Sequence, residues 1–207
     1  MEFSIWGFPV FKYKFDDPDK ALEDILKYAN EERLNEMSDD WNAKCKSTAM
    51  SRDLDTMKHI DHELEKILKK LSEHFQIPLE KMSFKGCKHP ECFGDYWVNQ
   101  YTKGDQQDVH YHMNPEFGDP PLFSFTYFAK YDPEKDAKFY FFNPSPAPDL
   151  YKDFIDTRSE FNLRKELDIQ EGDIIIFPSY MLHGVDEQVR DEPRITLSGN
   201  IHGLSKK

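Results

Sequence analysis

The feature that most constrains the fold of this chain is a change in hydrophobic periodicity near residue 81. Before this point, two segments carry apolar residues at helical spacing. After it, apolar residues fall in short aromatic and β-branched runs separated by Gly, Pro, Asp and Asn. The spacing predicts helices over residues 18–37 and 52–75, and the second should end before Pro78, because a residue that precedes proline disfavours the helical conformation.

The later part of the chain contains six runs that are typical of strands. They cover residues 95–101, 108–112, 122–131, 138–142, 173–177 and 193–201. Helices followed by short strands indicate an α+β protein in which a jelly-roll or barrel is buttressed by N-terminal helices. We expect a single domain over residues 1–207, with 1–80 as mainly helical support and 81–207 as the jelly-roll core.

Composition narrows the classes of function. The formal net charge of −12 argues against binding to nucleic acid or to a membrane surface, because neutralising phosphates requires clustered Lys and Arg. The chain shows neither a signal peptide at its start nor an apolar run long enough to span a membrane, so we expect a cytoplasmic protein. Cys45, Cys87 and Cys92 are odd in number, which suits reduced thiols. The Cys87–Cys92 segment lacks a second ligand pair and is interpreted as a loop rather than a zinc site.

Three histidines are candidates for one metal site. His110 and His112 lie two residues apart on a predicted strand, so their imidazoles should point to the same side. His183 follows a predicted apolar strand and a Pro-Ser turn, which can bring a distant ligand to the mouth of a barrel. Four other histidines are interpreted as structural or surface residues. They are His59, His62 and His74 on the second predicted helix, together with His89.

Arg194 is a candidate for binding an anion. Its guanidinium is a planar fork of donors that matches a carboxylate, and the next residue on the same face of the predicted strand is the hydroxyl-bearing Thr196. Three ligands together with an anion-binding arginine suggest an enzyme.

The order of these motifs resembles the Fe(II)/2-oxoglutarate-dependent dioxygenases, especially their small prolyl-hydroxylase-like members, which include bacterial and phage-encoded proteins. The resemblance covers residues 95–201. It is carried by Tyr101-x-x-Gly104, His110-x-His112, Gly172-Asp173-x-x-x-Phe177-Pro178, His183 and Arg194-x-Thr196. It implies a double-stranded β-helix of the cupin type, Fe(II) as cofactor, and 2-oxoglutarate and O2 as cosubstrates. For a phage-encoded member, the location would be the host cytoplasm.

The resemblance also implies roles for individual residues. His110 and His183 correspond to the two iron-binding histidines, and Arg194 to the residue that pairs with the distal carboxylate of 2-oxoglutarate. Tyr101 corresponds to a tyrosine that hydrogen-bonds the same cosubstrate. Further residues expected to contact the cosubstrate are Asn99, Thr196 and Ser198.

One position departs from the family pattern. Two residues after the first histidine the family usually has Asp or Glu, whereas this chain has His112. A neutral imidazole makes the site one charge more positive than a carboxylate would. We expect His110, His112 and His183 to bind the metal. Asp108 is a rival third ligand or an outer partner, since 108, 110 and 112 would alternate onto one face. In another alternative His112 points aside and water completes the shell.

The implied reaction couples oxidative decarboxylation of 2-oxoglutarate to succinate with hydroxylation of a substrate. The resemblance suggests a small molecule or a peptidyl or amino-acid side chain as that substrate. Residues 144–161 are interpreted as a loop that covers the site, and Tyr127 as a weaker candidate for lining the pocket. Two alternatives remain: a three-histidine cupin dioxygenase that needs no cosubstrate, and a non-catalytic metal-binding module. The sequence does not indicate an oligomeric state.

Overall fold

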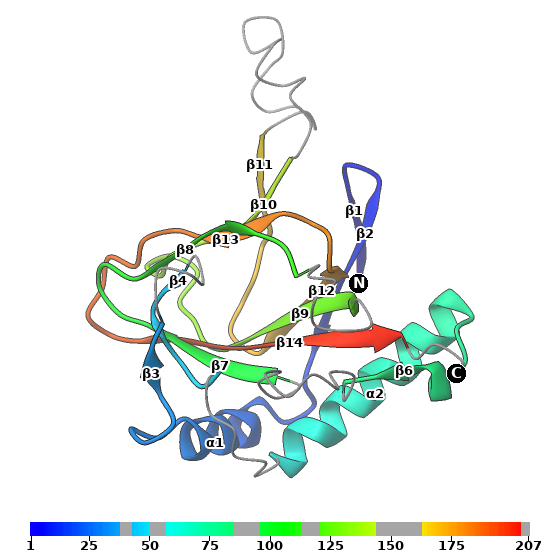
Figure 1. Ribbon diagram of the computed structural model, residues 1–207, viewed down its shortest axis with the longest axis horizontal. Helices are drawn as coiled ribbons and strands as arrows, with labels where there is room; N and C mark the ends of the chain where they lie inside the picture. Colours follow the sequence, from blue (N-terminus) through cyan, green and yellow to red (C-terminus); the bar gives the residue numbers. More distant parts are fainter. Residues whose placement is uncertain (38–42, 50–56, 85–95, 113–120, 144–162, 204–207) are drawn as a thin grey trace, which may run out of the picture.

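The computed structural model describes residues 1–37, 43–49, 57–84, 96–112, 121–143 and 163–203. In this part of the chain, two antiparallel β-sheets face each other, and two helices pack along the larger sheet (Figure 1). The predicted loop over 144–161 and the Cys87–Cys92 segment with His89 lie outside the described residues. Among the described residues, no helix has the length and apolar character needed to cross a membrane.

The larger sheet, sheet A, has nine strands among the described residues. Along the sheet they are β1 (Glu2–Ile5), β2 (Phe8–Lys14), β12 (Asp173–Pro178), β9 (Pro121–Lys130), β14 (Arg194–Gly203), β7 (Tyr96–Tyr101), β5 (Lys46–Ser47) and β3 (Asn35–Glu36), while β6 (Met82–Ser83) pairs with β14. Sheet B has five strands in the same part of the chain. They are β11 (Arg164–Glu166), β10 (Phe139–Phe142), β13 (His183–Val185), β8 (Gln106–His110) and β4 (Ala43–Lys44).

From β7 onward the chain passes repeatedly between the two sheets. Counted from β7, the first, third, sixth and eighth strands belong to sheet A, and the second, fourth, fifth and seventh belong to sheet B. Strand β12 lies between β2 and β9, and every one of its residues is buried. This position explains its continuous apolar sequence, because one face of the strand packs toward the two helices and the other faces sheet B. Because the strands alternate between the sheets in this way, the inner faces of the two sheets enclose a common interior.

Helix α1 (Pro18–Tyr28) is shorter than predicted. It begins after Asp17, whose side chain accepts a hydrogen bond from the backbone N–H of Lys20 at 2.9 Å. The predicted continuation to residue 37 is wrong, because the Asn30 side chain accepts hydrogen bonds from the backbone N–H groups of the next turn. These bonds stabilise a turn in place of a further helical turn, and β3 follows.

Helix α2 (Lys58–Phe75) ends before Pro78, as predicted. Gln76 closes it in the left-handed conformation with φ of 54°, and its N–H bonds to the carbonyl of Ser72. A short 3-10 helix, η2 (Leu79–Lys81), leads into β6. The predicted start of α2 at residue 52 falls outside the described residues.

A single apolar cluster joins both helices to the outer face of sheet A. It includes Ile25 of α1, Leu64 of α2, Ile174 of β12 and Leu197 of β14, all essentially inaccessible to solvent. Full burial of one such side chain contributes roughly 1.5–3 kcal/mol to folding. Tyr127 belongs to this cluster and stacks on Phe15, with ring centroids 4.1 Å apart. The suggestion that Tyr127 lines the pocket is therefore wrong.

Several strands were missed by the sequence interpretation. No strand was predicted before residue 81, yet β1 and β2 extend sheet A and β4 joins sheet B. The predicted strand over 108–112 is instead β8, which ends at His110, so His112 lies beyond the strand. The strands predicted around β7, β9, β10, β12 and β14 agree with the structure to within a few residues.

Candidate metal and cosubstrate site

The three candidate histidines converge between the two sheets. His110 ends β8, His183 begins β13, and the two are register partners in the antiparallel pair. The Nε2 atoms of His110 and His112 are 3.2 Å apart, and one ligand atom from each of the three imidazoles lies within 4.8 Å of the others. Among the described residues, this is the cluster of His, Cys, Asp and Glu side chains that could hold a metal ion.

A β-bulge in β8 determines which side chains face the site. Val185 pairs with Gln107, and His183 pairs with His110. Between these two pairs β8 contains one more residue than β13, which is a β-bulge. As a result, Gln107 and His110 both line the pocket, and Asp108 is exposed. The expectation that 108, 110 and 112 share a face is wrong, and the Asp108 carboxylate does not join the cluster. Instead, the Asp108 backbone carbonyl lies 2.8 Å from Nδ1 of His110.

Each imidazole presents Nε2 inward because Nδ1 faces an oxygen. Nδ1 of His183 lies 2.8 Å from the backbone carbonyl of Met181. Nδ1 of His112 lies 2.8 Å from Oδ1 of Asn200 and 3.0 Å from Oγ of Ser124. Outer partners of this kind orient metal-binding imidazoles and fix their tautomers.

Burial keeps the three imidazoles neutral. It lowers the pKa of His110 from its ordinary value, that of His112 to about 4, and that of His183 well below the usual range. Only a neutral imidazole has a lone pair for a metal. Two metal–nitrogen bonds of about 2.1 Å at a right angle would separate their nitrogens by about 3 Å, close to the observed 3.2 Å between His110 and His112. The donor set therefore fits a divalent iron ion with open coordination positions.

Arg194 begins β14 and is completely buried. Its Nε, Nη1 and Nη2 atoms have no hydrogen-bond partner among the described residues. The guanidinium lies among aromatic rings, with its carbon 4.9 Å from the ring centroid of Tyr101 and 5.4 Å from that of Phe128. Desolvation lowers the pKa of Arg194 from its ordinary value. Because the ordinary pKa of arginine lies far above neutral pH, the guanidinium stays charged. A buried charge without a hydrogen-bond partner is costly, so this site suits an anion.

The other predicted cosubstrate residues lie in the same pocket. Arg194 pairs with Tyr101 across β14 and β7, Thr196 pairs with Asn99, and Ser198 pairs with Trp97. These alternate residues of two neighbouring strands line one pocket together with the three histidines. The Tyr101 hydroxyl donates to Oε1 of Gln107 at 3.0 Å, which links the arginine end of the pocket to β8.

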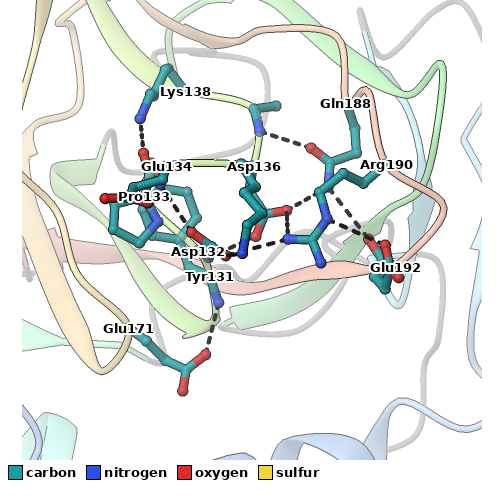
Figure 2. Close-up of polar contacts among 12 residues, drawn as sticks. Tyr131, Asp132, Pro133, Glu134, Asp136, Lys138, Glu171, Gln188, Arg190 and Glu192 are labelled. Atoms are coloured by element: carbon teal, nitrogen blue, oxygen red, sulfur yellow. Dashed lines mark hydrogen bonds and ion pairs between the residues drawn. The ribbon is translucent and has the colours of Figure 1, made fainter.

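A buried polar network holds the segment between β13 and β14 in place (Figure 2). Gln188 is fully buried, accepts from the backbone N–H of Ala137 at 2.7 Å and donates to Asp136 at 2.9 Å. Arg190 donates to the same Asp136 carboxylate at 3.3 Å. The segment that leads into Arg194 is thereby fixed to the turn between β9 and β10.

Comparison with known proteins defines the class. The family model described as "Putative 2OG-Fe(II) oxygenase" matches residues 95–200. The match spans half of the chain and includes all three histidines and Arg194, and the chain belongs to this family. It is accordingly an oxidoreductase that uses Fe(II), 2-oxoglutarate and O2. No match was found among curated proteins.

Solved structures with the same fold are distant in sequence. A prolyl-4-hydroxylase from Pseudomonas putida aligns with a TM-score of 0.63 at 13% identity, over 96% of this chain and 95% of that chain. A prolyl hydroxylase from Trichoplax adhaerens, in complex with a hypoxia inducible factor oxygen degradation domain peptide fragment, aligns with a TM-score of 0.61 at 11% identity. The alignment covers 94% of this chain and 83% of that chain. The non-heme alpha ketoglutarate dependent epimerase SnoN from nogalamycin biosynthesis aligns with a TM-score of 0.63 at 12% identity, over 94% of this chain and 76% of that chain.

Some pocket residues were missed by the sequence interpretation. Gln107 and Thr126 line the pocket, and Ser124 and Asn200 contact His112. Asn200 had a recoverable signal, because it continues the alternation of Arg194, Thr196 and Ser198 along one predicted strand. Gln107 had none, since its inward direction depends on the bulge.

Proposed function

We propose that this chain couples the oxidative decarboxylation of 2-oxoglutarate to hydroxylation of a second substrate at the site described above. In this proposal His110, His112 and His183 bind the iron, and Arg194 holds the distal carboxylate of 2-oxoglutarate. The observation that carries the proposal is the buried Arg194 guanidinium, without a hydrogen-bond partner among the described residues, in the pocket lined by the three histidines.

The energetics of Arg194 favour an anionic cosubstrate. An uncompensated buried charge costs several kcal/mol, and the nearby aromatic rings offset only part of that cost at about 0.5–2 kcal/mol each. A carboxylate would accept two parallel hydrogen bonds from the guanidinium. Tyr101, Asn99, Thr196 and Ser198 supply further polar groups along the same wall for the remaining oxygens.

The residues of the chain bind, orient and shield the reactants. Arg194 fixes one end of 2-oxoglutarate, so that its keto acid end is directed toward the histidines. Fe(II), when bound, supplies the activation of O2 that converts 2-oxoglutarate into succinate and CO2 and oxidises the substrate. Phe139 and Val185 give the pocket an apolar side that excludes water from this chemistry.

We further propose that the strands from β7 to β14 form a double-stranded β-helix within a single domain. Their order supports this, because the first, eighth, third and sixth strands are neighbours in sheet A, and the second, seventh, fourth and fifth are neighbours in sheet B. The packing of α1 and α2 on sheet A supports a buttressing role for these helices.

The substrate that we propose is a peptidyl or free amino-acid side chain. Support comes from the similar folds of the two prolyl hydroxylases, one of them in complex with a peptide fragment. The similar fold of an epimerase argues for testing small molecules in parallel, because fold alone does not determine the substrate.

Two alternatives have less support. A three-histidine dioxygenase that needs no cosubstrate would have no use for the buried charge of Arg194. A structural metal site would normally be closed by four protein ligands, whereas the described residues provide three histidines beside an open pocket.

Succinate production tests the proposed function. Purified protein would be incubated with Fe(II), 2-oxoglutarate, ascorbate and O2, with candidate peptides and amino acids added, and succinate would be quantified by mass spectrometry. We expect succinate from the wild type and a large loss in His183→Ala and Arg194→Met. Wild-type protein that binds iron but forms no more succinate than these variants would contradict the proposal.

A further inference from the structure

His112 differs from the other two histidines in what fixes its tautomer. Nδ1 of His110 and Nδ1 of His183 each face a backbone carbonyl, at 2.8 Å in both cases. A carbonyl oxygen only accepts, so each Nδ1 must carry the proton and each Nε2 must keep its lone pair. Among the described residues, Nδ1 of His112 instead contacts two side chains, Oδ1 of Asn200 and Oγ of Ser124.

The contact with Asn200 favours a proton on Nδ1 of His112, because an amide oxygen only accepts. Asn200 Oδ1 lies 2.8 Å from Nδ1 of His112 and also accepts from the Ser124 hydroxyl at 2.8 Å. Ser124 lies 2.9 Å from the hydroxyl of Ser179, which gives its single hydrogen a second possible acceptor. When that hydrogen is directed toward one of these oxygens, the Ser124 oxygen can accept from Nδ1 of His112.

The opposite tautomer would close the metal site. A proton on Nε2 of His112 would point at the lone pair of His110 Nε2, only 3.2 Å away. The two imidazoles would then be joined by a hydrogen bond, and neither nitrogen would be available to a metal. The tautomer of His112 therefore decides between a ligand and a hydrogen-bonded pair.

We propose that Asn200, supported by Ser124, is a positioning residue that makes His112 a metal ligand by holding the proton on Nδ1. This inference rests on the proposed function, because it concerns the third ligand of the same iron site. Asn200 and Ser124 are register partners on β14 and β9, so the pair is held by the central strands of sheet A. Strand β14 would then carry both the positioning residue for the metal ligand and, at its start, Arg194.

Nitrogen NMR tests the tautomer directly. Long-range proton–nitrogen spectra of the 15N-labelled, metal-free protein report which ring nitrogen is protonated, and His112→Gln would assign the signals. We expect His112 to be protonated at Nδ1 in the wild type. We expect the proton to move to Nε2 in the double variant Ser124→Ala/Asn200→Leu, because both acceptors are removed.

Cobalt binding tests the consequence. Titration with Co(II), followed by its visible absorption, measures affinity without any activity. We expect Asn200→Leu to weaken binding by about 10–100-fold, as is usual when the outer partner of a ligand is lost. Asn200→Asp retains an acceptor and should bind at least as tightly as the wild type. Asn35→Asp adds the same charge at the exposed strand β3 and should leave the affinity unchanged.

The outcomes separate this inference from the proposed function. Circular dichroism of the metal-free variants would first establish that each one folds. Cobalt affinity and tautomer unchanged in both Asn200→Leu and the double variant would overturn the positioning role while leaving the iron site intact. A wild type that binds no Co(II) would contradict the iron site itself. The NMR measurement of the His112 tautomer would still show whether Asn200 and Ser124 hold the proton on Nδ1.

Discussion

His110 and His183 are direct partners across the antiparallel strands β8 and β13, with their ring centroids 4.2 Å apart. Two of the proposed ligands are thus fixed to each other by the backbone ladder of sheet B. His112 approaches from beyond the end of β8 and depends on side chains of sheet A for its orientation. The proposed metal site therefore joins the two sheets.

Removing His183 should abolish metal binding. The His183→Ala variant loses one of two ligands held by the strand ladder, so we expect less than about a tenth of the wild-type metal content after reconstitution and desalting. Inductively coupled plasma mass spectrometry measures this content. The control is His62→Ala, at an exposed position of α2, which should retain full occupancy. Equal occupancy in the two variants would place the metal elsewhere.

Arg194→Met should separate stability from cosubstrate binding. The variant no longer buries a charge without a hydrogen-bond partner, so we expect a melting temperature at or above that of the wild type without ligand. At a hundred times its dissociation constant, 2-oxoglutarate should stabilise the metal-loaded wild type by about 2.7 kcal/mol and the variant hardly at all. Differential scanning fluorimetry measures both effects.

The matched control for Arg194→Met is Arg164→Met. Arg164 pairs with Asp186 on sheet B, outside the pocket. This variant should keep the full response to 2-oxoglutarate. A response that persists in Arg194→Met would show that the distal carboxylate binds elsewhere.

Cys45 should be unreactive in the folded protein. Burial raises the pKa of its thiol to about 12, and only the thiolate is nucleophilic. Because the pKa is raised, the neutral thiol persists as pH increases through 7 to 9. We expect iodoacetamide to label Cys45 at pH 8 only after denaturation, as measured by mass spectrometry of the peptide containing it. Rapid labelling of the native protein would indicate that this part of the core opens readily.

Gln188→Leu should destabilise the fold. It removes a hydrogen bond to Asp136 and leaves the backbone N–H of Ala137 unsatisfied (Figure 2). A buried donor without a partner costs about 1–3 kcal/mol. Urea denaturation measures this loss. Val189→Ala, at the neighbouring exposed position, should change stability by no more than about 0.5 kcal/mol.

The sequence predicted elements whose patterns are local. The strand around residues 173–177 is a continuous apolar run, and it is a fully buried interior strand of sheet A. The end of α2 before Pro78 follows from local backbone chemistry. By contrast, β1 and β2 carry mixed patterns. They pair with each other, and the pairing of β2 with β12 depends on contacts distant in sequence.

The site was predictable to the same extent. The three histidines and Arg194 were recognised from their order and spacing, and the structure brings them to one pocket. Period-two alternation placed Asp108 on the wrong side, because a bulge in β8 shifts the faces of the strand. Alternation along the predicted strand could have indicated the side on which Asn200 lies, but not its contact with His112, which requires the final arrangement of the two sheets.

Visible spectroscopy without oxygen tests the central claim most directly. Fe(II) would be added to the anaerobic protein, followed by 2-oxoglutarate, and the weak metal-to-ligand charge-transfer band of a chelated 2-oxo acid would be recorded for the wild type, His183→Ala and Arg194→Met. We predict a band in the wild type that is absent in His183→Ala and requires at least tenfold more 2-oxoglutarate in Arg194→Met. A wild type that binds Fe(II) but develops no band would contradict the account.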